Sequence, residues 1–135
     1  MEKRRTYIET VNIVDIATVT ALGETLEDTW LRIIKGDTGI APIRRFPVEA
    51  YESPIAATVN DLCPVGNRSI VCSLIERLLA VLEDIPEDAG LITATTKLGI
   101  DNLGHIRNKR EACADDILPG SMPEFVSNML GLKKT

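Results

Sequence analysis

Aromatic residues, histidine and cysteine are all scarce in this sequence. Trp, Tyr and Phe make up 4% of the 135 residues, and there is one histidine, His105. The cysteines, Cys63, Cys72 and Cys113, form neither an even set nor a CxxC pair, so no disulfide framework is predicted. A metal site on His105 would need ligands at spacings such as CxxC or HxxxH, which are absent. We therefore expect reduced thiols, no metal and no cofactor.

The sequence also lacks an excess of basic residues and any long apolar run. It has 15 basic and 20 acidic residues, a formal charge of −5. Phosphate-backbone binding relies on clustered Lys and Arg, so we expect no nucleic-acid partner. No run approaches the ~18 apolar residues of a membrane span. Glu9, Asn12 and Asp15 interrupt the apolar residues after the basic start, which a signal peptide would not tolerate. The prediction is a cytoplasmic protein.

The sequence contains enough hydrophobic residues, 44%, to form the core of one domain spanning residues 1–135. β-Branched runs predict strands, and apolar residues at helical spacing predict helices. The predicted elements are strand 13–19, helix 26–35, strand 55–59, helix 68–84, strand 91–95 and helix 122–130. This order favours an α/β fold, a layered sheet with flanking helices.

Helix-capping residues locate the predicted helices. Thr25 is an expected N-cap, with Asp28 three residues later, and Gly36 is placed to end the first helix. Asn67 is the expected N-cap of the second helix, and Ser121 with Glu124 has capping-box spacing before the last. Segment 37–54 is rich in proline and is expected to be irregular. Segment 102–116 is polar and is expected to be irregular or partly helical.

An ordered set of short motifs carries a family resemblance. The motifs are the turn Thr20-Ala21-Leu22-Gly23, the helix with Trp30, Gly36-Asp37-Thr38-Gly39-Ile40, Pro42-Ile43, Arg45-Phe46 and Ile55-Ala56-Ala57. In this order they resemble the opening of a β-ketoacyl-[acyl carrier protein] synthase, a condensing enzyme of the thiolase-like superfamily. The resemblance continues more weakly through the long helix, Leu91–Asp101 and the helix around Phe125–Met129, and so covers nearly the whole chain.

The resemblance implies a fold and a reaction. The fold would be the N-terminal half of a thiolase-like domain, truncated before the nucleophile elbow. Full-length relatives catalyse decarboxylative Claisen condensation of acyl and malonyl thioesters in fatty acid or polyketide synthesis. They use a Cys, two His and a Lys that lie beyond the matched region, so no catalytic residue is predicted here. Ala112-Cys113-Ala114 resembles the nucleophile tripeptide locally, but it precedes the last matched helix and is rejected.

Two alternatives to an enzyme fragment stay open. The chain is alternatively a short non-catalytic partner subunit, or carrier-docking protein, that completes a fold with another chain. It is otherwise a decayed gene product or an unrelated small α/β binding module. The expected partners are acyl carrier protein and the remainder of a condensing-enzyme domain or a partner chain, in a homo- or hetero-oligomer.

The resemblance also marks a possible substrate channel. The turn at Thr95, Thr96, Leu98 and Gly99 corresponds to a family turn near the acyl pocket that is usually glycine-rich. Leu98 departs from that pattern, and glycines there permit close backbone approach. Leu98 therefore either narrows the channel or fills a gap in the core.

Four basic residues are candidates for docking the acidic carrier protein, whose phosphopantetheine arm the family uses. They form two clusters, Arg44 with Arg45 and Lys109 with Arg110. The competing interpretation is that these clusters are solvated faces, which is the usual role of a run of charges.

Overall fold

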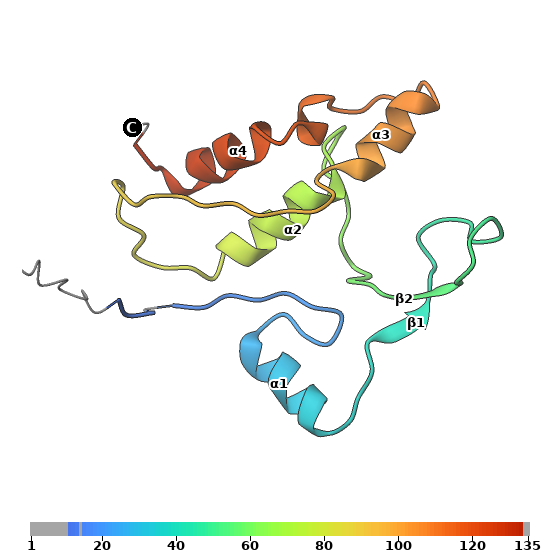
Figure 1. Ribbon diagram of the computed structural model, residues 1–135, viewed down its shortest axis with the longest axis horizontal. Coiled ribbons are helices and arrows are strands. Elements are labelled where there is room, and N and C mark those ends of the chain that lie inside the picture. The colour runs from blue at the N-terminus through green and yellow to red at the C-terminus, as the bar shows by residue number, and fades with distance from the viewer. Residues whose placement is uncertain (1–10, 14, 134–135) are drawn as a thin grey trace, which may run out of the picture.

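The computed structural model describes residues 11–13 and 15–133 (Figure 1). Within this part of the chain, the structure is mostly helical, with four α-helices, one 3₁₀ helix and two short strands. The elements are α1 Leu26–Ile34, β1 Ile40–Pro42, β2 Ile55–Ala57, α2 Ile70–Leu79, α3 Ile100–Arg107, η1 Asp115–Ile117 and α4 Ser121–Leu130.

The first helix, α1, confirms its capping signals. The Thr25 hydroxyl accepts a hydrogen bond from the Asp28 amide at 3.0 Å, which satisfies one of the amides left without a partner in the first turn. Gly36 has φ +78°, the left-handed conformation that glycine adopts at low cost after a helix. The prediction of a helix over 26–35 therefore holds almost to the residue.

The strands β1 and β2 form an antiparallel pair. Ile40 lies opposite Ala57, and Pro42 lies opposite Ile55. The strand predicted at 55–59 is thus confirmed over its first three residues. Its partner was missed, because β1 lies in the segment whose prolines predicted irregular structure. Pro42 is tolerated because this two-stranded sheet consists of edge strands, where a missing N–H donor costs little.

The other two predicted strands are wrong for the residues described. Ile13 and residues 15–19 are not in a strand, and neither is segment 91–95; Val14 lies outside the described residues. The layered α/β sheet is therefore not formed in this part of the chain, and a thiolase-like arrangement is not seen. The physical reason is that a β-branched run becomes a strand only when a neighbouring strand pairs with it. Here Ile92 is 96% exposed and has no such neighbour.

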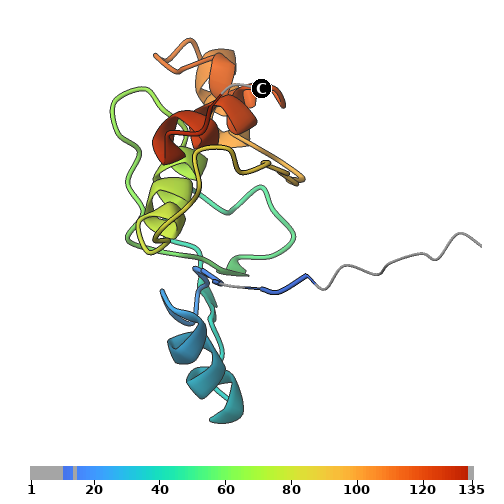
Figure 2. The same ribbon diagram turned by 90° about the vertical axis from the view of Figure 1, so that its left-hand side faces the viewer.

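The remaining helices gather around α2, as both views show (Figures 1 and 2). Cys72 of α2 and Met122 and Val126 of α4 are buried, and α1 lies apart from this cluster. Helix α2 is shorter than the predicted 68–84, and Ser69 rather than Asn67 is its N-cap.

Helix α4 starts close to its predicted position but without the predicted capping box. Gly120 is the N-cap and makes no side-chain cap bond. The Ser121 hydroxyl instead donates hydrogen bonds to the carbonyls of Asp115 and Leu118, so that it links α4 to η1.

Candidate functional site

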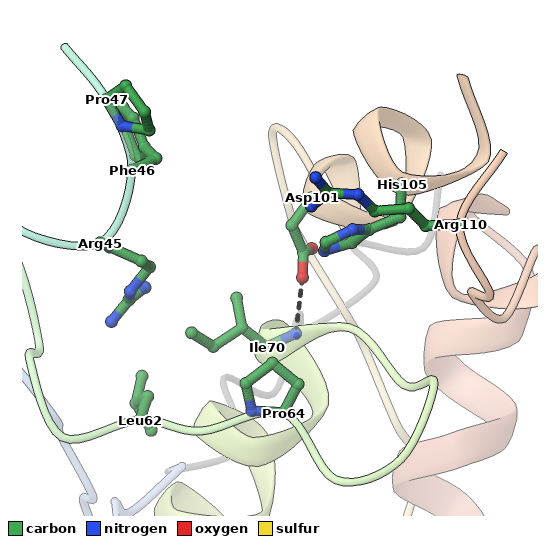
Figure 3. A pocket seen from close by; sticks show the side chains of 9 residues that line it. All are labelled: Arg45, Phe46, Pro47, Leu62, Pro64, Ile70, Asp101, His105 and Arg110. Atoms are coloured by element: carbon green, nitrogen blue, oxygen red, sulfur yellow. Dashed lines mark hydrogen bonds between the residues drawn. The ribbon is translucent and has the colours of Figure 1, made fainter. Parts of the chain in front are cut away.

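A cavity of about 390 Å³ lies between the loop after β1 and the adjoining ends of α2 and α3. This volume is within the range of small-molecule sites. Figure 3 shows Arg45, Phe46 and Pro47 on one side and the α3 side chains on the other. The lining residues are Arg45, Phe46, Pro47, Leu62, Pro64, Ile70, Asp101, His105 and Arg110.

The polar groups of this cavity are unevenly charged. The lining contains two guanidinium groups, those of Arg45 and Arg110, and one carboxylate, that of Asp101. Asp101 is already engaged, because it accepts hydrogen bonds from the Ser69 hydroxyl and, at 2.9 Å, from the Ile70 amide. A carboxylate at the start of α2 also offsets the positive end of the helix dipole. The charged side chains that line the cavity therefore have a net positive charge, which favours binding of an anionic group.

The wall below these charged groups is apolar. Leu62 is buried, and the rings of Phe46 and Tyr51 lie with centroids 5.6 Å apart, which supports the Phe46 side of the opening. Pro47, Pro64 and Ile70 complete the wall. The site combines a cationic edge with a nonpolar body, which is the pattern for binding an amphiphilic anion.

The structure brings together two of the four residues predicted to dock a carrier protein. Arg45 and Arg110 line the same cavity although they are far apart in the sequence. The Arg45 guanidinium donates to the Val59 carbonyl at 2.6 Å, which fixes its position. Arg44 instead lines a neighbouring hollow with Ala41, Pro42, Arg45 and Asn60. Lys109 lies outside the cavity, in the turn after α3, with φ +55°.

The predicted substrate-channel residues do not line this cavity. The Thr95 hydroxyl accepts a hydrogen bond from the Leu98 amide at 3.3 Å, and Thr96 is exposed. Leu98 has φ +44°, a conformation that normally favours glycine.

Gly99 is required by packing. A Cβ at this position would lie 2.6 Å from the Asp116 carbonyl oxygen and 2.9 Å from the Ser69 Cβ. Because real Cβ atoms do not approach this closely, only glycine lets α3 begin against α2 and η1.

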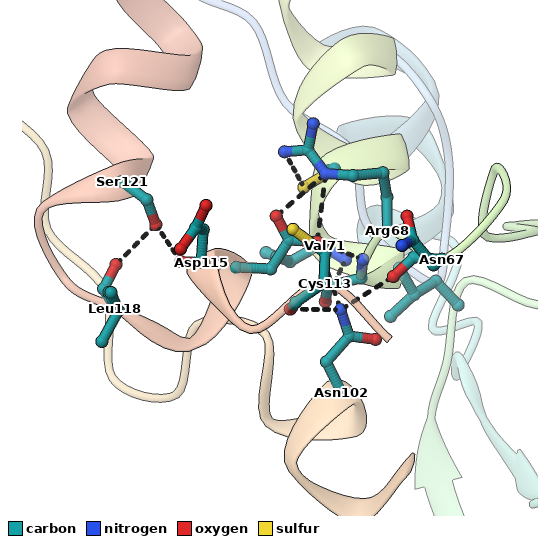
Figure 4. Close-up of polar contacts among 12 residues, drawn as sticks. Asn67, Arg68, Val71, Asn102, Cys113, Asp115, Leu118 and Ser121 are labelled. Atoms are coloured by element: carbon teal, nitrogen blue, oxygen red, sulfur yellow. Dashed lines mark hydrogen bonds and ion pairs between the residues drawn. The ribbon is translucent and has the colours of Figure 1, made fainter. Parts of the chain in front are cut away.

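A buried polar junction that no sequence pattern indicated lies behind this turn (Figure 4). Ser69, Asn102 and Asp116 are 0%, 2% and 4% exposed. The Asn102 amide donates to the carbonyls of Asn67 and Cys113, at 3.1 and 3.0 Å. Predicting this junction would have required knowing that residues near 68, 101 and 116 meet.

Arg68 connects the junction with α4. Its Nε donates to both carboxylate oxygens of Asp116, at 2.9 and 3.1 Å. Its guanidinium carbon lies 4.8 Å from the Phe125 ring centroid, a cation–π contact with α4. No buried polar side-chain atom lacks a partner among the described residues, so the junction is a satisfied structural network.

The buried thiol of Cys72 does not have the properties of a nucleophile. Burial raises the pKa of the Cys72 thiol, and the nearby Asp116 charge raises it further. Cys72 is therefore protonated at neutral pH, whereas a nucleophilic cysteine needs a lowered pKa. No group of three or more His, Cys, Asp or Glu side chains among the described residues is placed to hold a metal ion. Residues 11–13 and 15–133 also contain no helix long and apolar enough to cross a membrane.

Comparison with known proteins gives one partial relationship. No family model matches the chain, and no solved structure does. The chain is 38% identical over 64 residues to 3-oxoacyl-[acyl-carrier-protein] synthase 2 of Coxiella burnetii. The matched region covers 47% of this chain but only 14% of that protein's length. The chain is thus partially related, at moderate identity, to a β-ketoacyl-acyl carrier protein synthase.

Proposed function

We propose that this chain is a carrier-protein-docking part of a β-ketoacyl-acyl carrier protein synthase-like protein and does not catalyse condensation by itself. The observation that supports docking most directly is the convergence of Arg45 and Arg110 on one cavity with an apolar wall. The partial identity to a 3-oxoacyl-[acyl-carrier-protein] synthase is the reason for proposing a carrier-bound acyl thioester as the ligand.

The chemistry of a carrier-bound substrate fits this cavity. Family members use an acidic carrier protein whose arm contains a phosphate and ends in a thioester-linked acyl chain. Guanidinium groups form charge-assisted hydrogen bonds with phosphate and carboxylate oxygens. In this proposal Arg45 and Arg110 hold the anionic groups, and Phe46, Leu62 and Ile70 contact the nonpolar part of the arm or acyl chain.

The chain's own side chains support a non-catalytic role. The family's Cys, His, His and Lys have no counterparts in this sequence. Cys72, the most buried thiol described, is held as a neutral group beside Arg68 and Asp116. In this proposal the condensing reaction, and a thiolase-like sheet with partners for segments 13–19 and 91–95, both require further polypeptide.

Carrier binding gives the direct test. We expect the full 135-residue chain to bind the acyl-loaded carrier in isothermal titration, with affinity that falls as salt increases. Arg45→Ala and Arg110→Ala should each weaken binding by about tenfold, the scale of one charge-assisted hydrogen bond. Arg44→Ala and Lys109→Ala are matched controls, since each removes a neighbouring charge outside this cavity. Equal weakening by all four variants would mean diffuse attraction rather than a docking site.

A second role, as a non-catalytic partner subunit, is favoured by the exposed apolar face of α1. Trp30 and Ile34 are each 60% exposed, and this helix contributes no buried residue. Condensing activity that is absent from the chain alone, and appears only in a complex with a second polypeptide, would support this role. Condensation by the purified chain alone would overturn both proposals.

The turn at Thr95, Thr96, Leu98 and Gly99 is proposed to lie beside the acyl channel of the completed protein. The left-handed backbone of Leu98 and the close packing of Gly99 support a shape like that of the family's glycine-rich turn. Replacing Leu98 with Gly in a longer, active protein tests the idea. Unchanged product chain lengths would contradict it.

A further inference from the structure

Helix α3 places two side chains on the wall of the cavity. Asp101 and His105 are four positions apart in this helix, and both line the cavity. Side chains four residues apart lie on the same face of an α-helix. Asp101 and His105 therefore mark the face of α3 that is turned toward the cavity, and His105 is half-buried there.

A Schellman motif at the end of α3 brings Arg110 to the same wall. The Arg110 amide donates to the His105 carbonyl at 2.9 Å, and the Lys109 amide donates to the Ile106 carbonyl at 2.9 Å. These are the two hydrogen bonds of the motif, and Lys109, with φ +55°, is its left-handed residue. The chain turns back at Lys109, so that Arg110 follows close to His105. In Figure 3 both side chains point from the end of α3 into the cavity.

The donor groups on this wall are available to a ligand. Among the described residues, no hydrogen bond or ion pair engages the His105 ring or the Arg110 guanidinium. On the facing wall, Arg45 uses Nη2 to donate to the Val59 carbonyl, which leaves its Nε and Nη1 groups for other partners. Each carboxylate oxygen of Asp101, by contrast, already accepts a hydrogen bond. Three donor side chains are therefore open to an anionic ligand.

The arrangement of these donors suits a phosphate group better than a carboxylate. His105 and Arg110 approach from the α3 side, and Arg45 approaches from the loop opposite. The oxygens of a phosphate group are tetrahedral, so they accept hydrogen bonds from two facing walls at once, whereas the two oxygens of a carboxylate point to one side. A phosphate monoester also carries a charge of about −1.5 to −2 at pH 7. The net positive lining attracts it more strongly than it attracts a singly charged carboxylate.

We propose that His105, Arg110 and Arg45 form a phosphate-binding site for an organic phosphate ester whose nonpolar part lies against Leu62 and Ile70. The His105 ring N–H donates to one phosphate oxygen, and the guanidinium groups donate charge-assisted hydrogen bonds to the others. The site rests on the proposed function in one respect, because both use the same cavity. It assigns the phosphate, and not a carboxylate, to the end of α3.

Small anions that share one nonpolar tail test the choice of head group. The probes are hexyl phosphate, methyl hexyl phosphate and hexanoate, each titrated calorimetrically into the full 135-residue chain at about pH 7. We expect the preferred phosphate ester to bind at least about tenfold more tightly than hexanoate. Tighter binding of the diester would support a carrier-attached arm, and tighter binding of the monoester would support a free phosphate ester. Hexanoate that binds as tightly as both esters, or no binding by any probe, would overturn the proposal.

Variants of His105 test its role directly. His105→Phe keeps an aromatic ring but removes the N–H donor, whereas His105→Gln keeps a side-chain N–H donor. We expect His105→Phe to weaken binding of the preferred phosphate ester by about tenfold, and hexanoate binding by less than about twofold. His105→Gln should retain most of the phosphate affinity, which a merely structural role would not predict.

A matched control comes from the same helix. Arg107→Ala removes an exposed charge from α3 at a position outside the cavity and should leave the binding of all three probes unchanged. Circular dichroism of each variant checks that α3 is still folded. A folded His105→Phe variant that binds the phosphate ester normally would reject the assigned role of His105.

Phosphate binding and carrier docking are separable. Phosphate esters that bind through His105, together with an acyl-loaded carrier that does not bind, would reject only the proposed function. Carrier binding that depends on Arg45 and Arg110 but shows no preference for phosphate over carboxylate probes would reject only the phosphate site.

Discussion

The Asp116 carboxylate accepts a hydrogen bond from the Ser69 amide at 2.5 Å, and this bond joins residues 47 positions apart in the chain. The same carboxylate pairs with Arg68 and accepts a bond from the Asn102 amide at 3.3 Å. A single buried carboxylate thus connects the start of α2 with α3 and η1. It is the central acceptor of the helical cluster.

Replacing Asp116 with Asn should destabilise the fold strongly. The change removes a buried charge that Arg68 and the Ser69 amide both bind, and it places an N–H₂ group among donors. We expect the free energy of unfolding to fall by about 2–4 kcal/mol in urea denaturation. Asp115→Asn, at the exposed neighbouring position, should change it by less than about 0.5 kcal/mol. Similar values for the two variants would contradict the assigned role of Asp116.

The two glycines at and within α3 should respond in opposite directions to alanine. Gly99→Ala places a methyl group 2.6 Å from the Asp116 carbonyl oxygen and should destabilise by about 1–3 kcal/mol. Gly104→Ala meets no atom within 4 Å and should stabilise the helix by about 0.5–1 kcal/mol. Thermal unfolding of both variants measures the difference. A stabilising Gly99→Ala would mean that α3 does not begin against η1.

The three thiols should differ in reactivity. Cys63 is exposed, Cys113 is half-buried and Cys72 is buried. Burial also raises the pKa of Cys72 above its ordinary value of 9.0, so its thiolate is rare at pH 8. We expect iodoacetamide to modify Cys63 first, as read by mass spectrometry, and Cys72 only after urea unfolding. Early labelling of Cys72 would show that the cluster opens.

The raised pKa of Cys72 also has a consequence for stability. A group whose pKa is higher in the folded state stabilises the fold below its unfolded pKa, and that stabilisation is lost as pH rises through the folded pKa. The unfolding free energy should therefore decline above about pH 9. Cys72→Ala should remove this part of the decline, while Cys63→Ala should not.

Local signals in the sequence predicted local structure well. Thr25, Asp28 and Gly36 fixed both ends of α1, because capping involves residues only a few positions apart. The apolar stripe after Ser69 predicted α2, though its last predicted turn did not form. Ile55 to Ala57 was identified as a strand before its partner was known.

Non-local structure was not predictable in the same way. Ile92 is in a segment with strand-like composition, yet strand formation depends on a second segment being present to pair with it. The convergence of Arg45 with Arg110, and of Ser69 with Asp116, depends on how the helices pack. Residue composition marked both arginines as candidates, but only the fold placed them in one cavity.

A pH-dependent ion pair connects α2 with the loops before it. Arg77 Nη1 lies 2.9 Å from Asp61 Oδ2 and 2.8 Å from Glu24 Oε1. The hydrogen bond from Arg77 lowers the pKa of Asp61 below its ordinary value of 3.8. A group with a lowered folded pKa stabilises the fold above its unfolded pKa, and this contribution is lost as pH falls through the folded pKa.

Asp61→Asn should therefore be less stable than the unmodified chain at pH 7 and equal to it in strong acid. The difference should be small and should shrink in 1 M salt, because Asp61 is exposed and its charge is screened. Urea denaturation across pH 2 to 7 measures the convergence. Asp88→Asn, which changes an exposed carboxylate in a separate loop, is the matched control. A constant difference between Asp61→Asn and the unmodified chain at every pH would show that the Asp61 charge has no part in the effect.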